Sequence, residues 1–186
     1  MVLSTLGMEK AYYDFSIGRW RFVVLDTMDV AVSGGWPMES ENYREGQKLL
    51  AELTERDAVN AVDWSGGMGE AQKRWLSDVL ADAEKLGQKV MVFGHVPLLP
   101  ANDPHNLWNS EEIVEILESY DCVTAYLCGH RHSGGYFEQK GIHYITVEGM
   151  VEAGEENAYG AVRLCGNRLE IKGEGRMVSR TFLVGK

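Results

Sequence analysis

Two short apolar segments of this 186-residue chain end in the same dipeptide, Gly-His. Residues 89–95 read KVMVFGH, and residues 124–130 read TAYLCGH. Continuous apolar runs of this length, without alternating polar residues, are typical of strands that are covered on both faces, as in a parallel sheet. Pro97 and Pro100 then prevent the first strand from extending. The sequence therefore predicts two buried strands, each of which delivers a histidine at its carboxyl end.

Helical patterns separate the predicted strands. An apolar strand at residues 19–26 is followed by leucines at helical spacing within residues 41–55. Residues 70–86 carry one apolar stripe at helical spacing, which Gly87 ends as a C-cap. Ser110 is expected to cap a further helix whose first turn is acidic. Strand and helix thus alternate over the first two-thirds of the chain.

The last third of the chain has a different pattern. Short segments separated by turn residues are typical of a run of antiparallel strands; they lie at residues 134–138, 141–147, 159–164 and 168–172. No break in composition marks an internal boundary. We therefore expect one α/β domain over residues 1–186, with a layered architecture and a β-rich C-terminal third.

The overall charge excludes several classes of partner. Lys and Arg number 18 and Asp and Glu number 28, which gives a formal net charge of −10. Such a chain repels phosphate backbones and anionic lipid, so we expect no nucleic-acid or membrane partner. The apolar runs are far shorter than a membrane span, and no leader peptide is recognisable. Three cysteines without CxxC spacing favour reduced, mostly buried thiols and a cytoplasmic protein.

Three histidines form the candidate site. Ligands gather at the carboxyl ends of the strands in open α/β sheets, so His95 and His130 are expected at one rim. His132 follows two residues later and points to the same side in extended backbone. Three imidazoles at one rim suit a transition metal. His105 and His143 lack this context, and we assign them to turn or packing roles.

Two carboxylates, Asp26 and Asp29, follow the first strand at the same predicted rim. They could hydrogen-bond a metal-bound histidine from outside the metal's ligand shell. The alternative, which we favour, is that they end the strand and hydrogen-bond within a turn.

The Gly-His elements resemble those of a known family. Gly94-His95-Val96-Pro97 and Gly129-His130-Arg131-His132 are similar to the GH and GHxH elements of calcineurin-like metallophosphoesterases. The resemblance is closest to the manganese-dependent ADP-ribose/CDP-alcohol diphosphatase branch. It extends in order over nearly the whole chain, through residues 12–15, 20–26, 65–67, 107–109, 129–137 and 173–176.

The resemblance implies a fold, a metal site and a substrate class. The fold would be part of the metallophosphoesterase layered sandwich, with mixed sheets flanked by helices. His95 and His130 would bind one ion and His132 a second, in a dinuclear site for manganese, with zinc, iron or magnesium as alternatives. The substrate would be a small nucleotide diphosphate of the ADP-ribose or CDP-alcohol type. No residue of this chain is assigned a catalytic role.

Trp108 and Asn109 match a Leu-Trp-Asn segment of the family and are candidate substrate-binding residues. The indole would stack on the base, and the amide would hydrogen-bond the nucleotide. The alternative of equal weight is a tryptophan packed under a loop, with the asparagine near a helix cap.

Three family elements are missing from the sequence: Asp-x-His before the Gly-His strands, Gly-Asp, and Gly-Asn-His. Asp103-Pro104-His105 has the first spacing but follows the first Gly-His strand. Without the carboxylates of these elements, manganese has only imidazole ligands, which suit it poorly. We therefore expect the C-terminal portion of the family domain, weak or inactive unless the missing half is supplied. An unpaired strand edge and an uncovered apolar surface then predict self-association.

Two further functions stay open. One is an inactive remnant that binds a nucleotide or a protein. The other is a zinc hydrolase with a single ion on the three histidines, because catalytic zinc needs three protein ligands and an open position.

Overall fold

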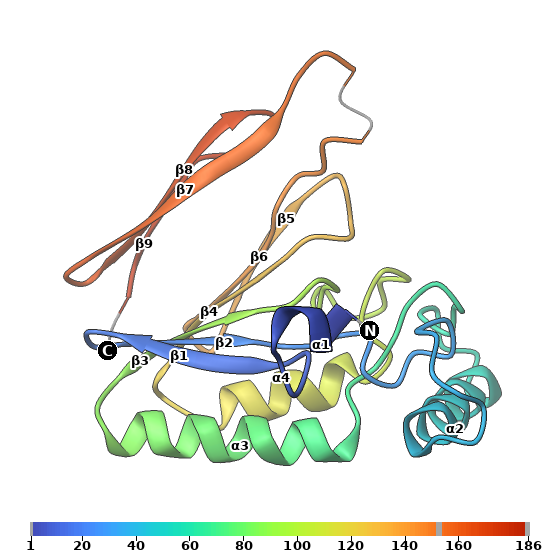
Figure 1. Ribbon diagram of the computed structural model, residues 1–186. Helices are drawn as coiled ribbons and strands as arrows, with labels where there is room; N and C mark the ends of the chain where they lie inside the picture. The colour runs from blue at the N-terminus through green and yellow to red at the C-terminus, as the bar shows by residue number, and fades with distance from the viewer. Residues whose placement is uncertain (1, 152–153, 185–186) are drawn as a thin grey trace.

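A six-stranded mixed sheet forms the centre of the computed structural model, which describes residues 2–151 and 154–184 (Figure 1). Its strand order is β1-β2-β3-β4-β6-β5. The strands span Tyr13–Ile17, Trp20–Val24, Lys89–Phe93, Val123–Cys128, Gly135–Gln139 (β5) and Ile142–Thr146 (β6). Strands β2, β3, β4 and β6 are parallel, and the two edge strands are antiparallel to their neighbours. The parallel strands direct their carboxyl ends to one rim.

Helices cover one face of this sheet. In Figure 1, α3 (Glu70–Lys85) and α4 (Ser110–Glu118) run beneath the strands, whereas α2 (Glu41–Glu55) lies to one side and α1 is the short helix Val2–Leu6. The apolar stripe of α3, with Leu76 and Leu80, belongs to one buried cluster with Val90 and Val92 of β3. Burial of these side chains on both elements fixes the helix against the sheet.

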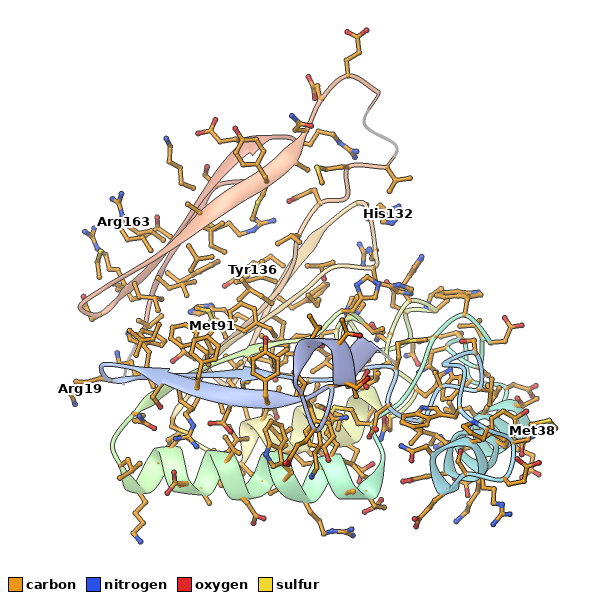
Figure 2. All side chains as sticks on the ribbon, in the orientation of Figure 1. Arg19, Met38, Met91, His132, Tyr136 and Arg163 are labelled. Atoms are coloured by element: carbon orange, nitrogen blue, oxygen red, sulfur yellow. The ribbon has the colours of Figure 1, made fainter. Side chains whose placement is uncertain are left out.

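A second sheet covers part of the opposite face. It consists of β7 (Ala158–Cys165), β8 (Arg168–Gly175) and β9 (Arg180–Leu183), paired antiparallel in that order. Leu169 and Ile171 of β8 cluster with Met91 and Leu127 of the central sheet, and Figure 2 shows Met91 between the two sheets. Helices, central sheet and second sheet form the layered α/β arrangement that the sequence predicts.

The structure corrects two details of the predicted elements. Strands β5 and β6 do form a hairpin, but β6 pairs in parallel with β4, so this hairpin extends the central sheet. The predicted run of antiparallel strands is therefore divided between two sheets. The N-cap of α4 is Asn109, not Ser110, which is the first helical residue. The C-cap of α3 is Leu86, not Gly87, which is the next residue and has φ at 63°.

The cysteines differ in exposure. Cys128 is buried, Cys122 is half-buried and Cys165 is exposed, and all three are free thiols. Burial raises the pKa of Cys122 to about 11 and that of Cys128 to about 12. No helix within the described ranges has the length and apolar character needed to cross a membrane.

Candidate functional site

The two Gly-His turns lie side by side at the carboxyl rim of the sheet. The Gly94 N–H donates to the Leu127 carbonyl at 3.0 Å, and the Gly129 N–H donates to the His95 carbonyl at 3.0 Å. His130 adopts φ of 64°, in the left-handed region. The His95 Nε2 and His130 Nδ1 atoms are then 3.3 Å apart, with ring centroids 5.1 Å apart. The parallel pairing of β3 and β4 thus brings together two imidazoles that are 35 residues apart in sequence.

A buried tyrosine holds the first of these turns. The Tyr126 hydroxyl donates to the Val96 carbonyl at 2.6 Å, and the residue is fully buried. A Cβ atom at Gly94 would lie 2.2 Å from that hydroxyl and 3.0 Å from the Thr27 side chain. Only glycine fits at this position, because the backbone passes so close to Tyr126. The glycine before His95 is therefore a packing requirement.

His132 lies on the same rim but is held differently. The Gly149 N–H donates to the His132 carbonyl at 3.0 Å, and a Cβ at Gly149 would lie 2.9 Å from the His132 ring. Figure 2 shows His132 beyond the start of β5. Together with His130 it lines an open depression, whose wall residues are Asp103, Pro104, His105, His130, Arg131, His132 and Ser133.

The environment of His130 favours its neutral form. Burial lowers its pKa, and the neighbouring imidazoles His95, His105 and His132 lower it further. Its Nε2 atom is buried and has no hydrogen-bond partner among the described residues. A neutral imidazole keeps a lone pair on one of its ring nitrogens, as a metal ligand requires.

The two closest imidazoles match the spacing of metal ligands. Two nitrogens bound tetrahedrally to one ion at about 2.0–2.1 Å lie roughly 3.3–3.4 Å apart. The separation of 3.3 Å between His95 Nε2 and His130 Nδ1 agrees with this value, and the two atoms are also within hydrogen-bond distance. In the described part of the chain, however, no group of three His, Cys, Asp or Glu side chains is arranged to hold an ion. The described residues therefore do not form a complete metal site by themselves.

His105, for which the sequence predicts a turn or packing role, lies close to the candidate site. The His105 ring lies 6.0 Å from the His130 ring, centroid to centroid, and its side chain is 42% exposed. Its Nδ1 atom is 2.9 Å from the Asp103 carboxylate, whose other oxygen pairs with Arg131 at 2.9 Å. The Asp-x-His spacing was the only local signal for this arrangement. His143, by contrast, is buried between the sheets, as expected.

Burial would raise the pKa of Asp103, but other contacts outweigh that effect. Its carboxylate accepts hydrogen bonds from the backbone N–H and the ring of His105, and Arg131 adds a positive charge. The pKa of Asp103 is therefore held below its ordinary value. The carboxylate stays ionised and ties the loop that carries His105 to the Gly-His-x-His turn.

An exposed tryptophan that the sequence analysis missed stands beside the histidines. The Trp64 ring centroid is 5.3 Å from that of His130 and 5.5 Å from that of His105. The residue is 46% exposed. It lies in the loop before α3, where no periodic pattern marks it. An exposed indole at this position offers a surface on which a base can stack.

Trp108 does not offer such a surface. It is 3% exposed, and its indole N–H donates to the Val62 carbonyl at 3.0 Å. The Asn109 side-chain amide hydrogen-bonds the backbone of Met68. Its oxygen accepts the Met68 N–H at 3.1 Å, and its nitrogen donates to the Met68 carbonyl at 2.8 Å. The packing alternative therefore holds for both residues, because their polar groups fasten the loop before α3 to the start of α4.

Asp26 fits the turn alternative, whereas the side chain of Asp29 hydrogen-bonds residues distant in the sequence. Asp26 accepts from the Met28 N–H at 3.0 Å, and Asp29 accepts from the Gly69 N–H at 3.1 Å and from the Asn42 amide at 3.2 Å. Burial raises the pKa of both carboxyls, and this effect outweighs the hydrogen bonds, which lower it. Both residues thus shape the loops under the rim.

Comparison with known proteins gives a consistent result. The sequence profile of the calcineurin-like phosphoesterase family matches residues 13–134. A manganese-dependent ADP-ribose/CDP-alcohol diphosphatase from Arabidopsis thaliana is 37% identical, over 93% of this chain and 60% of that protein. The human protein of the same name is 31% identical, over 91% of this chain and 53% of its own length.

A solved structure is similar over the same range. The crystal structure of a dimetal phosphatase from Danio rerio matches with a TM-score of 0.87 at 29% identity. The match covers 97% of this chain and 62% of that one. The chain therefore spans between about half and three-fifths of the proteins that it resembles.

Proposed function

Because the chain belongs to the calcineurin-like phosphoesterase family, we propose that it serves metal-dependent hydrolysis of pyrophosphate or phosphodiester bonds in small nucleotides. One observation carries the proposal: His95 and His130 place two ring nitrogens 3.3 Å apart at the carboxyl rim of a parallel sheet. The relatives are named manganese-dependent diphosphatases, which favours a divalent ion at this position. Residues 1–186 would form a single domain that is the C-terminal portion of a calcineurin-like phosphoesterase domain.

Each histidine has a role in this proposal. His95 and His130 would hold one divalent ion, and His132 would face a second. Bound divalent ions neutralise charge on the phosphoryl group and activate water. The missing ligands of both ions would come from the carboxylates of the three family elements that this sequence lacks. Manganese is the expected ion, with zinc, iron and magnesium as alternatives. Carboxylate and water oxygens, which manganese prefers, would complete the set of metal ligands.

The substrate proposal rests on Trp64 and on the names of the relatives. ADP-ribose and CDP-alcohols both join a nucleoside to a diphosphate. Trp64 is 46% exposed beside the imidazoles, so a base could stack there while the diphosphate lies over the histidines. We therefore propose a nucleoside diphosphate derivative as substrate. We also propose a cytoplasmic location, which the free thiols favour.

The test compares the chain alone with the chain supplied with a polypeptide that carries the three missing family elements. In the presence of manganese, we expect cleavage of ADP-ribose or a CDP-alcohol only in the supplemented mixture. Chromatography of the nucleoside monophosphate product measures this cleavage. His130→Ala removes a proposed ligand and should abolish the signal. An equal rate with His130→Ala, or no cleavage in either mixture, would reject the proposed hydrolysis.

The alternative is a module that binds a nucleotide or a protein without catalysis. It is favoured by the incomplete ligand set among the described residues. Calorimetry with ADP-ribose in chelator separates the two functions. Metal-independent binding that persists in His130→Ala, together with no cleavage, would support the alternative.

A further inference from the structure

We propose that His105 is a specificity-determining residue that recognises the ribose of a bound nucleotide, and that Asp103 is its positioning residue. The contact is a hydrogen bond from a ribose hydroxyl to the His105 Nε2 atom. The inference rests on the proposed function for its ligand class, a nucleoside diphosphate derivative. It gives a role to a loop that neither Gly-His motif includes.

The first step is the orientation of the imidazole. The Asp103 Oδ1 atom lies 2.9 Å from His105 Nδ1 and also accepts the His105 backbone N–H at 2.9 Å. An ionised carboxylate only accepts hydrogen bonds, so the neutral ring carries its hydrogen on Nδ1 and keeps a lone pair on Nε2. The side chain is 42% exposed on the wall of the open depression. His105 therefore offers a ligand an acceptor and not a donor.

The second step is the support of the carboxylate itself. The Asp103 side chain is 15% exposed, and its Oδ2 atom lies 2.9 Å from a guanidinium nitrogen of Arg131. Arg131 Nε donates in turn to the Ser133 hydroxyl at 3.1 Å. Because the carboxylate is held by the Gly-His-x-His turn as well as by the loop of His105, it keeps the imidazole in one orientation before a ligand arrives.

The third step is the place of His105 beside the two ends of the ligand. The Trp64 and His130 ring centroids are 5.3 Å apart, and the His105 centroid lies 5.5 Å from that of Trp64 and 6.0 Å from that of His130. In the proposed complex the base stacks on Trp64, and the phosphates lie over the histidines of the Gly-His turns. The ribose joins these two parts, so it is the part of the ligand that passes His105.

The lone pair on Nε2 selects the group that it contacts. Phosphate oxygens accept hydrogen bonds and carry negative charge, so this atom gives them no favourable contact. A ribose hydroxyl has a hydrogen that it can donate. The acceptor on His105 therefore favours a ribonucleoside over an analogue without these hydroxyls, because a site built to hydrogen-bond a hydroxyl discriminates against a ligand that lacks it.

The test compares adenosine with 2′,3′-dideoxyadenosine, which differs only by the absence of both ribose hydroxyls. Titration of the nucleosides in chelator keeps metal ions, phosphate and hydrolysis out of the readout. A pH of about 8.5, roughly two units above the ordinary pKa of histidine, keeps the ring in its neutral form. We expect the wild type to bind dideoxyadenosine about fivefold more weakly than adenosine, as for the loss of one neutral hydrogen bond.

Two variants of His105 separate the acceptor from the ring. In His105→Phe, which keeps an aromatic ring without an acceptor, the two nucleosides should bind within about 1.5-fold of each other. His105→Gln should recover a preference of at least about twofold, because its amide oxygen can reach the position of Nε2. Trp64→Ala is the matched control, since it removes the base contact: both nucleosides should bind more weakly while their ratio stays at about fivefold. Thermal melting of each variant verifies folding.

The role of Asp103 has its own readout. Nitrogen NMR of the His105 ring should show hydrogen on Nδ1 in the wild type and a mixture of tautomers in Asp103→Leu, which has a similar volume but no acceptor. The preference for adenosine should fall in the same variant. Unchanged tautomers in a folded Asp103→Leu protein would overturn the positioning role.

The ribose contact would be overturned by equal affinity of the wild type for the two nucleosides, by an unchanged preference in His105→Phe, or by a wild type that does not bind adenosine. These results do not depend on catalysis. A preference that His105→Phe abolishes, in a protein whose supplemented mixture cleaves no ADP-ribose, would support the ribose contact and reject only the proposed hydrolysis. Cleavage without the preference would reject only the role of His105.

Discussion

At the scale of single residues, Trp64 and Trp108 show that exposure to solvent separates a residue that could bind a ligand from one that packs the interior. Trp108 is packed in the interior, whereas Trp64 is 46% exposed. We expect Trp108→Ala to lower the free energy of unfolding by about 3–5 kcal/mol, because it leaves a cavity. Trp64→Ala should change it by less than about 1 kcal/mol, as surface substitutions do. Urea unfolding followed by circular dichroism measures both.

The same pair separates a stacking role from a structural one. Trp64→Ala should weaken the binding of ADP and of adenosine alike, since a stacking surface serves the base. Trp108→Ala at a temperature where it remains folded should leave both affinities near wild type. A Trp64→Ala protein with unchanged adenosine affinity would contradict the stacking role.

Asp103 links the site to the pH dependence of stability. Because its pKa is held below the ordinary value, its ionised form stabilises the folded chain. That stabilisation is present above the unfolded pKa of about 3.9 and is lost as the pH falls through the lower folded pKa. Asp103→Asn should therefore be less stable than wild type near neutral pH, with a difference that shrinks below about pH 4. Unfolding midpoints across acidic pH measure the effect, and a constant difference would refute it.

At the scale of elements, the two Gly-His turns look alike in sequence but differ in packing. A Cβ at Gly94 would lie 2.2 Å from the buried Tyr126 hydroxyl, whereas the nearest atom to a Cβ at Gly129 would be His95 Nδ1 at 3.9 Å. We expect Gly94→Ala to cost about 1–3 kcal/mol, the usual range for overpacking. Gly129→Ala should lie within about 0.5 kcal/mol of wild type. Thermal melts of the two variants test this, and equal losses would contradict the steric explanation.

The helices and the buried strands could be predicted from the sequence because their patterns are local. Residues 41–55 form α2 over the same range, and the strand at residues 89–95 contains β3. The position of β6 could not be predicted in this way. Its parallel pairing with β4 is set by contacts such as Ala125 with His143, which no local period encodes.

The candidate site was predictable only where it follows directly from a strand. His95 and His130 come at strand ends, so the parallel sheet alone brings them together. His105 and Trp64 lie on loops, and their positions depend on long-range contacts such as Asp103 with Arg131. The sequence left Trp108 between a substrate-binding and a packing role, because a motif gives the identity of a residue but not the direction of its side chain.

At the scale of the whole molecule, the second sheet leaves part of the central sheet open. Along β1, Tyr13, Phe15 and Ile17 are 43%, 44% and 65% exposed. Phe15 stacks on Phe22 at 5.1 Å, centroid to centroid, which continues the apolar surface onto β2. An edge strand with an open apolar face is a template for association. The structure thus contains the surface that the sequence analysis expected to be uncovered.

We expect the chain to self-associate through this open face of β1. We expect the average mass in sedimentation to rise above the 20.8 kDa of one chain as concentration increases. Phe15→Glu places a charge in the middle of the apolar face and should return the mass to that of one chain, because burying an unpaired carboxylate is unfavourable. Leu86→Glu, at an exposed apolar residue that follows α3, is the matched control and should associate like the wild type. A wild type that stays at one chain's mass, or a Leu86→Glu variant that dissociates equally well, would show that β1 is not the contact.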